Sequence, residues 1–468
     1  MLRSFLRRSG LWLGAKIIQA CIIVFVFYIY AIILTREDYG NFQKVFVLVG
    51  FLSGFLCFGL PVYIAALPPD SLDDHLLNLI KKGKWIFITI ILLLLAGIYT
   101  FFPQYRSPYV SIVFLLGLLN AFNLVYEVYA LKKSGDSFVW KANFAFSVLY
   151  LLIHLLVLTD YQLIFLVTAL SLAAIVRLTI FIGRYGFIGK SKQHSDALGG
   201  HAYFSQWIFI SINEGLESFS KYLDKIVLIA LLTATEFAIY FNGSYEIPLL
   251  GLLVAVAGTF TNLQITKYSL NNEQIRQLFY STTSLVSTLV FPLFFFSCLY
   301  ASSIFNVLFG NKYDEAVPFF LIYAWIIPLR IANYSAVLQA KMKSNLVTAG
   351  SLSALVLKLL LMVLLYRSSG VKGIALAVVI GTYYQVLFYI YHIARVLTIP
   401  IVKVLPFKKL AIVFLLAAGV NLGAYYAIRH LPSLQQLIFG GSVLAINAVA
   451  GFLILIKQEK DLSLLKEG

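Results

Sequence analysis

The chain has 468 residues, of which 61% are hydrophobic and 12% are charged, and its formal net charge is +16. Soluble domains carry about 25% charged residues, so this composition excludes an ordinary cytosolic enzyme, a disordered chain and a disulfide-stabilised secreted scaffold. It predicts an all-α integral membrane protein with about 14 transmembrane helices, because each span needs about 20 apolar residues. A β-barrel is excluded because its strands alternate in polarity, whereas the apolar runs here are unbroken.

The apolar segments that we expect to span the membrane follow one another with short loops between them. In chain order they cover residues 11–34, 44–66, 85–102, 109–131, 143–159, 162–182, 206–232, 236–262, 281–305, 316–340, 346–366, 372–394, 407–428 and 435–456. The first segment is too long for the core of a signal peptide, so we expect it to be retained. The 3 cysteines all lie in apolar runs and form neither a metal-binding nor a disulfide pattern.

Basic residues in the short loops predict the orientation of the chain. Lys and Arg number 23 on the side that holds both termini and 7 on the other side. Cytoplasmic loops are enriched in Lys and Arg, so both termini are expected in the cytoplasm. Membrane topology therefore explains the net positive charge, and no nucleic-acid partner is expected.

A polar loop at 183–205 divides the predicted spans into two sets. Its Gly, Ser, Lys and His residues are typical of a flexible connector. We therefore predict an N-terminal six-helix lobe at 1–182, a cytoplasmic connector at 183–205, a C-terminal six-helix lobe at 206–395, and two extra transmembrane helices with a cytoplasmic tail at 396–468.

The two predicted lobes share a short motif. The segment ILTREDYGNF at 33–42 matches LLTATEFAIY at 231–240 as aliphatic-Leu-Thr-x-x-acid-aromatic-small-x-aromatic, with an offset of 231 − 33 = 198 residues. Six spans per copy is an even number, so both copies have one orientation. A pseudo-two-fold axis along the membrane normal is then expected to relate the two lobes.

Ionised side chains inside apolar spans are costly, so each one is a candidate functional residue. The segment 206–232 carries five on one helical face: Glu214, Glu217, Lys221, Asp224 and Lys225. Such a stripe cannot face lipid, and we expect it to line a wet cavity. The alternatives are ion pairs within the helix and a position of the segment in the cytoplasmic interface.

Four further candidates lie in other spans. Lys16 aligns with Glu214 under the same offset, so the two copies would present polar faces to each other; the alternative is that Lys16 snorkels to the headgroups. Arg330 and Lys358 are single charges deep in their spans, and Glu246 lies beside Pro248. For Lys358 the alternative is an ion pair with Glu246 or a bond to a backbone carbonyl.

Several other residues in the spans have structural interpretations. Arg177 and Glu127 lie nearer the ends of their spans, and we expect them to reach the membrane interface. We expect His154 to be a hydrogen-bonded packing residue rather than a proton relay. Prolines indicate where helices bend or break, and they occur at Pro61, Pro248, Pro292, Pro318 and Pro328.

Motifs for catalysis are absent from the sequence. It contains no Walker A, His-Glu-x-x-His or Gly-x-Ser-x-Gly pattern, and the predicted outer loops are too short to hold a catalytic domain. We therefore expect a carrier that is not an enzyme, with no cofactor and no bound metal.

The sequence resembles the polysaccharide transporter family, the bacterial O-antigen or lipid-linked oligosaccharide flippases. That family belongs to the multidrug/oligosaccharidyl-lipid/polysaccharide exporter superfamily, together with the multidrug and toxin extrusion pumps and the peptidoglycan lipid flippase. The resemblance rests on SGLWLG at 9–14, ILTREDYG at 33–40, FGLP at 58–61, LDKIVLI at 223–229 and YEIP at 245–248. Glu246 departs from the family pattern, which more often has a basic or neutral residue there.

The resemblance implies a flippase that moves an isoprenoid-pyrophosphate-linked oligosaccharide from the cytoplasmic to the outer leaflet of the bacterial inner membrane. Alternating access would be driven by an ion gradient. The pyrophosphate would be bound by the basic residues Lys16, Lys221, Lys225, Arg330 and Lys358. The coupling cation or proton would be bound, or the lysines balanced, by Glu214, Glu217, Asp224 and Glu246.

The implied partners are the lipid-linked oligosaccharide, the lipid bilayer, the coupling ion, and a polysaccharide polymerase or glycosyltransferases. Two other functions remain open. One is a cation-coupled multidrug antiporter of the same superfamily, and the other is a membrane polysaccharide polymerase or ligase.

Overall fold

In a computed structural model of the protein, the structure describes the backbone of residues 2–67, 72–101, 108–133, 136–188, 200–244 and 270–458, with single positions between 250 and 265. Every regular element in these ranges is an α-helix or a short 3₁₀ helix. The predicted all-α class is therefore confirmed. The described chain separates into two compact units, residues 1–238 and 239–468. The predicted lobe boundaries stay a prediction.

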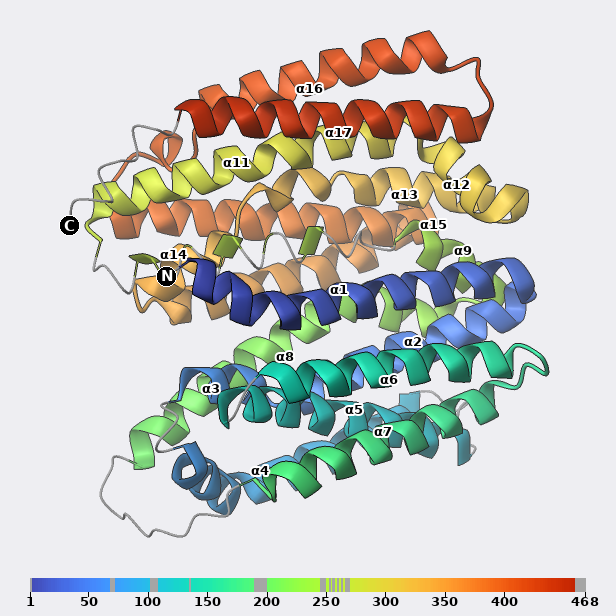
Figure 1. Ribbon diagram of the computed structural model, residues 1–468, viewed down its shortest axis with the longest axis vertical. Helices are drawn as coiled ribbons and strands as arrows, with labels where there is room; N and C mark the ends of the chain where they lie inside the picture. Colours follow the sequence, from blue (N-terminus) through green and yellow to red (C-terminus); the bar gives the residue numbers. More distant parts are fainter. Residues whose placement is uncertain are drawn as a thin grey trace. The chain divides into compact units, whose positions relative to one another are not determined.

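The described part of the first unit contains eight complete helices and the start of a ninth (Figure 1). The complete helices are α1 (Leu2–Ile33), α2 (Arg36–Leu56), α3 (Leu60–Ala66), α4 (Leu72–Phe101), α5 (Pro108–Lys133), α6 (Asp136–Val157), α7 (Leu163–Tyr185) and α8 (Gly200–Leu231). Helix α5 packs against α2 and α7, α6 packs against α1 and α7, and α8 packs against α2. The interior of the unit is thus formed by the contacts between these helices.

The two copies of the repeated motif form the same kind of helix start. Thr35 caps α2, and its hydroxyl oxygen accepts a hydrogen bond from the Asp38 backbone N–H at 3.1 Å. The hydroxyl of Thr233 accepts from the Glu236 N–H at 3.3 Å at the start of α9 (Ala234–Gly243), and the Glu236 carboxylate accepts from the Thr233 N–H at 3.0 Å. The threonine and the acid three residues later satisfy N–H groups that a helix start leaves unpaired.

The predicted span 44–66 is not one helix. It begins earlier, at Arg36, and is interrupted between α2 and α3. Phe58 and Gly59 both have positive φ angles, 47° and 63°, which reverse the local winding. Pro61 stands in the first turn of α3, where its missing N–H costs nothing.

The second unit begins within α9 and contains the remaining helices that the structure describes. They are α11 (Asn272–Leu299), α12 (Ala301–Phe309), η3 (Gly310–Ala316), α13 (Val317–Ala324), η4 (Ile327–Ile331), α14 (Tyr334–Ala340), α15 (Ser344–Leu397), η5 (Ile401–Lys403), α16 (Phe407–Ile428) and α17 (Ser433–Gln458). The predicted span 316–340 is thus divided into α13, η4 and α14. Pro328 lies in the first turn of η4, at this interruption.

Helix α15 is a hairpin of two arms. Gly370 breaks its helical geometry with φ 56° and ψ −138°. The Tyr389 hydroxyl donates to the carbonyl oxygen of Val347 at 3.1 Å, and Gly381 lies against the side chain of Lys358. These pairs have nearly constant sums of residue numbers, so the arms are antiparallel. The arms correspond to the predicted spans 346–366 and 372–394.

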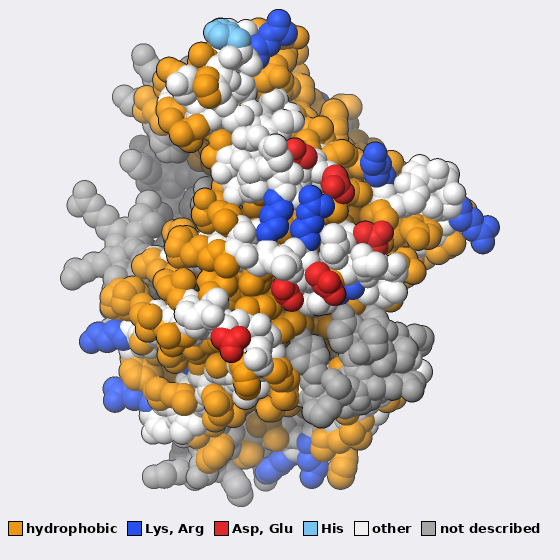
Figure 2. All heavy atoms as spheres, turned by 90° about the vertical axis from the view of Figure 1, so that its right-hand side faces the viewer, with side chains coloured by type: hydrophobic (Ala, Val, Ile, Leu, Met, Phe, Trp, Pro, Cys, Tyr) orange, Lys and Arg blue, Asp and Glu red, His pale blue; other side chains and the backbone are white. Residues whose placement is uncertain are grey.

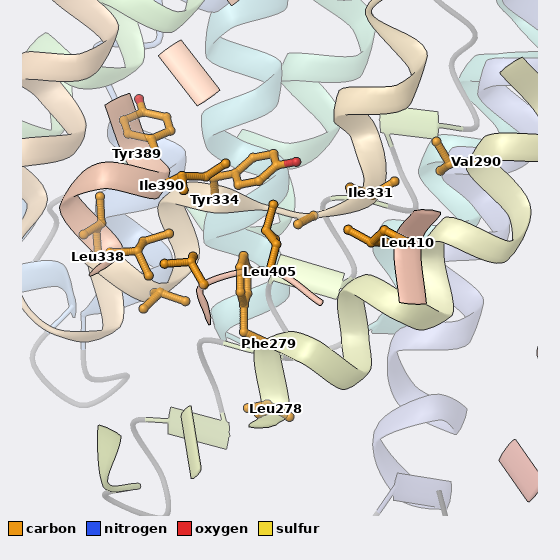
Figure 3. Close-up of a cluster of buried hydrophobic side chains, with 14 of the residues drawn as sticks. Leu278, Phe279, Val290, Ile331, Tyr334, Leu338, Tyr389, Ile390, Leu405 and Leu410 are labelled. Carbon is orange, nitrogen blue, oxygen red and sulfur yellow. The ribbon is translucent and has the colours of Figure 1, made fainter. Parts of the chain in front are cut away.

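A buried hydrophobic cluster holds the second unit together (Figure 3). Phe279 and Val290 come from α11, Tyr334 from α14, Ile390 from α15 and Leu410 from α16. Close packing between helices, rather than exclusion of water, favours association within a bilayer. This cluster therefore fixes α11 against α14, α15 and α16.

The surface of the chain suits a lipid environment. Among the described residues, 7 helices are long and apolar enough to cross a membrane, and the α15 hairpin is one of them. Large apolar side chains are exposed on several helices, including Leu156, Leu415 and Ile446 at 67–70%. The face drawn in Figure 2 shows wide hydrophobic areas with scattered acidic and basic side chains. The protein is a multi-pass membrane protein.

Candidate functional site

One face of α8 packs closely on α2. Trp207 Nε1 donates to the carbonyl oxygen of Phe58 at 2.9 Å, at the break between α2 and α3. A Cβ atom at Gly50 of α2 would lie 2.6 Å from the Tyr222 hydroxyl, and one at Gly54 would lie 2.6 Å from the Ser218 hydroxyl. The two glycines of α2 therefore allow this close approach.

The ionisable stripe of α8 adjoins the face that makes this contact. Glu217 and Lys221 are exposed and Glu214 is half-buried. Asp224 is only 2% exposed, and its carboxylate is 3.2 Å from Lys225 Nζ. One end of the stripe thus holds an ion pair within the helix, as in one of the alternatives, while Glu217 and Lys221 remain open to solvent or a ligand.

The other predicted basic residues lie in the second unit. Arg330 is half-buried in η4, where its ψ of 18° departs from helical geometry. Lys358 is 4% exposed, and its stem crosses Gly381 of the opposite arm of α15. The side chain of Lys16 and the whole of Glu246 lie outside the described residues. That all these residues line one cavity stays a prediction.

Lys44 is a buried charge at the first position of the predicted span 44–66, and it was not among the candidate residues from the sequence. It is 7% exposed, and its Nζ donates to the carbonyl oxygen of Leu232 at 2.7 Å. The ammonium group also lies 5.7 Å from the centre of the Phe237 ring. A cation at the C-terminal end of α8 is favoured by the helix dipole. In the sequence, Lys44 lies two residues after the repeated motif, which ends at Phe42.

The expectation that Arg177 and Glu127 reach the interface is wrong. Arg177 of α7 is 9% exposed and Glu127 of α5 is 2% exposed. Arg177 Nη2 donates to a Glu127 carboxylate oxygen at 2.9 Å and to Asn143 Oδ1 of α6 at 2.5 Å. Pairing across three helices removes the need to reach the headgroups, because each buried charge has its partner inside the unit.

The expectation for His154 is confirmed. Its side chain is fully buried, and Nδ1 lies 2.9 Å from the Tyr30 hydroxyl. Tyr30 in turn donates to the His154 carbonyl oxygen at 3.2 Å. The histidine therefore ties α6 to α1.

No group of three His, Cys, Asp or Glu side chains that could hold a metal ion occurs in the described part of the chain. Instead, the acidic and basic groups Glu217 and Lys221 are exposed on one helix, α8.

These features define a multi-pass, all-α membrane protein with ionisable groups inside its bundle. The chain belongs to the polysaccharide biosynthesis protein family, whose model matches residues 29–318. This family membership agrees with the resemblance noted in the sequence. No curated protein is matched by sequence comparison.

The solved structures that are similar to the chain are transporters. The lipid II flippase MurJ in an inward closed conformation has 14% identity and a TM-score of 0.67, covering 96% of this chain and 99% of that chain. An inward-facing MATE family transporter of the MOP superfamily has 16% identity and a TM-score of 0.58, covering 80% and 94%. A MOP superfamily transporter from Pyrococcus furiosus, described as having a binding pocket of reverse polarity, has 14% identity and a TM-score of 0.57, covering 84% and 95%. The chain therefore has the fold of these membrane transporters.

Proposed function

We propose that this protein is a flippase that moves an isoprenoid-pyrophosphate-linked oligosaccharide from the cytoplasmic to the outer leaflet of the bacterial inner membrane. The observation that carries the proposal is the open part of the α8 stripe. Glu217 and Lys221 are exposed on α8, which packs on α2 and which we expect to span the membrane. Ionised groups are kept in a bilayer when they line a pathway for a polar substrate.

The chemistry of the substrate fits the basic residues. A pyrophosphate carries several negative charges and must lose water to cross hydrocarbon, so cationic side chains have to replace that water. Lys221 and Lys225 of α8 are two such groups, and Arg330 is partly exposed in an interrupted helix. The family membership and the flippase named among similar structures support this substrate class.

The transport cycle would be alternating access driven by an ion gradient. Glu214 and Glu217 would bind the coupling cation or proton, while Asp224 balances Lys225. In this proposal the protein is not an enzyme, both termini are cytoplasmic, and a polysaccharide polymerase or glycosyltransferases act before or after it on the same lipid-linked glycan.

The test is glycan export by variants in a host strain that lacks its own flippase. The double variant Lys221→Ala, Arg330→Ala should reach the membrane in normal amount and lower surface glycan at least tenfold. The matched control is Lys82→Ala, Arg367→Ala, because both of its residues are exposed outside the stripe. Wild-type glycan in the first variant would reject these two residues as substrate ligands.

A second candidate function is a cation-coupled multidrug antiporter, which the similarity to MATE transporters favours. Such a pump would use the acidic residues of α8 for cationic drugs. Ethidium efflux from proteoliposomes that is abolished by Glu214→Gln, with no transport of a lipid-linked oligosaccharide, would replace the flippase proposal.

A further inference from the structure

Two turns of the second unit lie at the same end of the α15 hairpin. One turn, at 341–343, joins α14 to the first arm, and the other, at 398–406, joins the second arm to α16. The arms are antiparallel, so the start and the end of α15 lie at one end of the unit. The start of α11 lies there too, because Asn272 Nδ2 donates to the carbonyl oxygen of Leu397 at 3.2 Å.

Both turns have a backbone geometry that fixes the direction of the chain. Met342 and Thr398 have positive φ angles, 58° and 56°. The N–H groups of the next residues, Lys343 and Ile399, each donate to a carbonyl oxygen five residues earlier, at 2.8 and 3.0 Å. These are the features of a Schellman helix end, which satisfies the last carbonyl groups of a helix. Each turn is therefore a defined structure rather than a loose loop.

The second turn is also anchored in the core of the unit. Val404 and Leu405 are buried and belong to the hydrophobic cluster that fixes α11 against α14 (Figure 3). The Tyr280 hydroxyl of α11 donates to the carbonyl oxygen of Lys403 at 2.6 Å. The residues on either side of this anchor consequently keep their side chains outside the core.

Large apolar side chains are exposed on both turns and on the residue that follows the second turn. Met342 is 88% exposed and Val402 is 71% exposed, and Ile401 and Phe407 are each about half exposed. Apolar surface in contact with water is unfavourable, whereas the same side chains are favoured at the boundary between headgroups and acyl chains. This end of the unit is therefore suited to a lipid interface.

Unpaired lysines lie next to these apolar side chains in the sequence. They are Lys341, Lys343, Lys403, Lys408 and Lys409. The acidic side chain that the structure describes at this end, Glu273, already forms an ion pair with Arg276. With Arg276 and Arg395 included, the described side chains at this end carry a formal charge of 7 − 1 = +6.

The opposite end of the same unit is much less basic. It contains the tip of the α15 hairpin and the residues that follow α12 and α16. Its described basic side chains are Lys312, Arg367, Lys372 and Arg429, and its described acidic side chains are Asp314 and Glu315. The formal charge there is 4 − 2 = +2. The excess of positive charge thus coincides with the exposed apolar turns.

We propose that the basic end, formed by 341–343, 401–403 and 407–409, binds anionic phospholipids of the surrounding leaflet. Clusters of lysines beside membrane spans attract anionic headgroups. The ammonium groups bind the headgroup phosphates, while Met342, Val402 and Phe407 enter the layer of acyl chains below them. This lipid site is separate from the proposed transport function and does not depend on it.

The test compares two photoreactive lipids on the full-length protein in phosphatidylcholine nanodiscs. Each carries a diazirine near the glycerol end of one acyl chain, and the headgroup is phosphatidylglycerol in one and phosphatidylcholine in the other. Mapping of chymotryptic peptides should find at least fivefold more phosphatidylglycerol adducts on 341–346 and 399–409. Added salt should lower this ratio, because salt screens exposed charges. Equal adducts from both lipids would overturn the proposal, and an acidic partner protein would then fit the lysines better.

Two matched triple variants locate the charges that select the lipid. Lys403→Gln, Lys408→Gln and Lys409→Gln are combined at the basic end, and Arg367→Gln, Lys372→Gln and Arg429→Gln at the opposite end. Each triple removes three exposed positive charges from the same unit. The ratio of adducts on 399–409 should approach unity in the first triple and stay at the wild-type value in the second. An equal fall in both would show a response to net charge alone and would overturn the proposal.

A second pair of variants tests the apolar contact. Met342→Ser combined with Val402→Ser should lower the adducts of both lipids on the two turns at least threefold, because the turns lose their hold in the acyl layer. Leu434→Ser combined with Ile438→Ser makes the same change at exposed positions of α17 and should leave those adducts unchanged. Wild-type labelling of the turns in the first variant would show that they stay outside the lipid, which would overturn the proposal.

Discussion

Lys44 of α2 binds the C-terminal end of α8. Its Nζ is 2.7 Å from the carbonyl oxygen of Leu232 and 3.5 Å from that of Ile229. The last carbonyl groups of a helix have no hydrogen-bond partner within the helix. The Lys44 ammonium group therefore donates to a buried carbonyl oxygen that would otherwise be unpaired. The contact joins residues 188 positions apart in the sequence.

We expect Lys44→Met to destabilise the first unit. The variant keeps the apolar stem but removes a charged hydrogen bond, which typically contributes about 1.5–3 kcal/mol. Thermal unfolding in detergent should show a lower midpoint than the wild type. Lys82→Met, at an exposed position of α4, is the control and should unfold as the wild type does. Equal midpoints for both variants would contradict the role of Lys44.

The start of α2 also lies very close to the start of α9. A Cβ atom at Gly40 would overlap the carbonyl oxygen and carbon of Ala234. Both atoms belong to backbone and cannot move aside without shifting a helix. We expect Gly40→Ala to lower the unfolding midpoint, with a cost of about 1–3 kcal/mol, the typical range for overpacking of an interior.

The control for Gly40 is Gly97→Ala in α4. No atom lies within 4 Å of a Cβ at that position, and alanine is favoured over glycine within a helix by about 1 kcal/mol. Gly97→Ala should therefore be neutral or stabilising. A similar response of both variants in the same unfolding assay would show that the close contact at Gly40 is unimportant.

The sequence predicted the helical class and the family resemblance, and it also holds local start signals that were not used. Thr35 and Thr233 each precede an acid by three residues, and that local spacing alone determines the cap. Pro61 and Pro328 likewise mark the starts of helices after an interruption. Signals of this kind depend on residues that are close in the sequence, so they can be recognised without knowledge of the fold.

The partners of buried charges could not be predicted in this way. Glu127 and Arg177 are 50 residues apart, and hydropathy alone cannot show that α5 and α7 bring them together. Lys44 is the first residue of the predicted span 44–66, and its neighbours in the sequence do not indicate that it is buried. Its burial depends on the contact with the end of α8, which no local pattern encodes.

A double-mutant cycle tests the pair of Glu127 and Arg177. Each single change, Glu127→Gln or Arg177→Met, leaves one buried charge uncompensated and should cost about 3–5 kcal/mol. The double variant should cost clearly less than the sum. The more exposed pair Glu273 and Arg276 in α11 is the control and should show a coupling below about 1 kcal/mol. Additive costs at Glu127 and Arg177 would contradict the pairing.

His75 gives the first unit a dependence on pH. Its side chain is 8% exposed on the buried face of α4, and this burial lowers the pKa of the imidazole below its ordinary value, while Asp74 acts in the opposite direction. The unfolded chain then binds a proton more readily, so stability is complete above the ordinary pKa of about 6.5 and decreases as the pH falls below it. The unfolding midpoint should fall between pH 7.5 and 5.5, and His75→Gln should reduce that fall. An unchanged pH profile in the variant would exclude His75 as its source.

Lys358 and Gly381 allow a structural role to be separated from a transport role. A Cβ atom at Gly381 would overlap the Cγ atom of Lys358, which is too near the Lys358 backbone to swing away. Gly381→Ala should therefore lower stability and displace the ammonium group. Adding Lys358→Ala removes the overlap, so the double variant should regain the stability of Lys358→Ala alone.

Glycan export then decides what Lys358 does. If it binds the pyrophosphate, the stable double variant should still export at least tenfold less glycan than the wild type. Gly419→Ala in α16 is the control, because no atom lies within 4 Å of a Cβ there. Wild-type export by the double variant would show that Lys358 only fills the space beside Gly381, and the set of candidate phosphate ligands would then lose this residue.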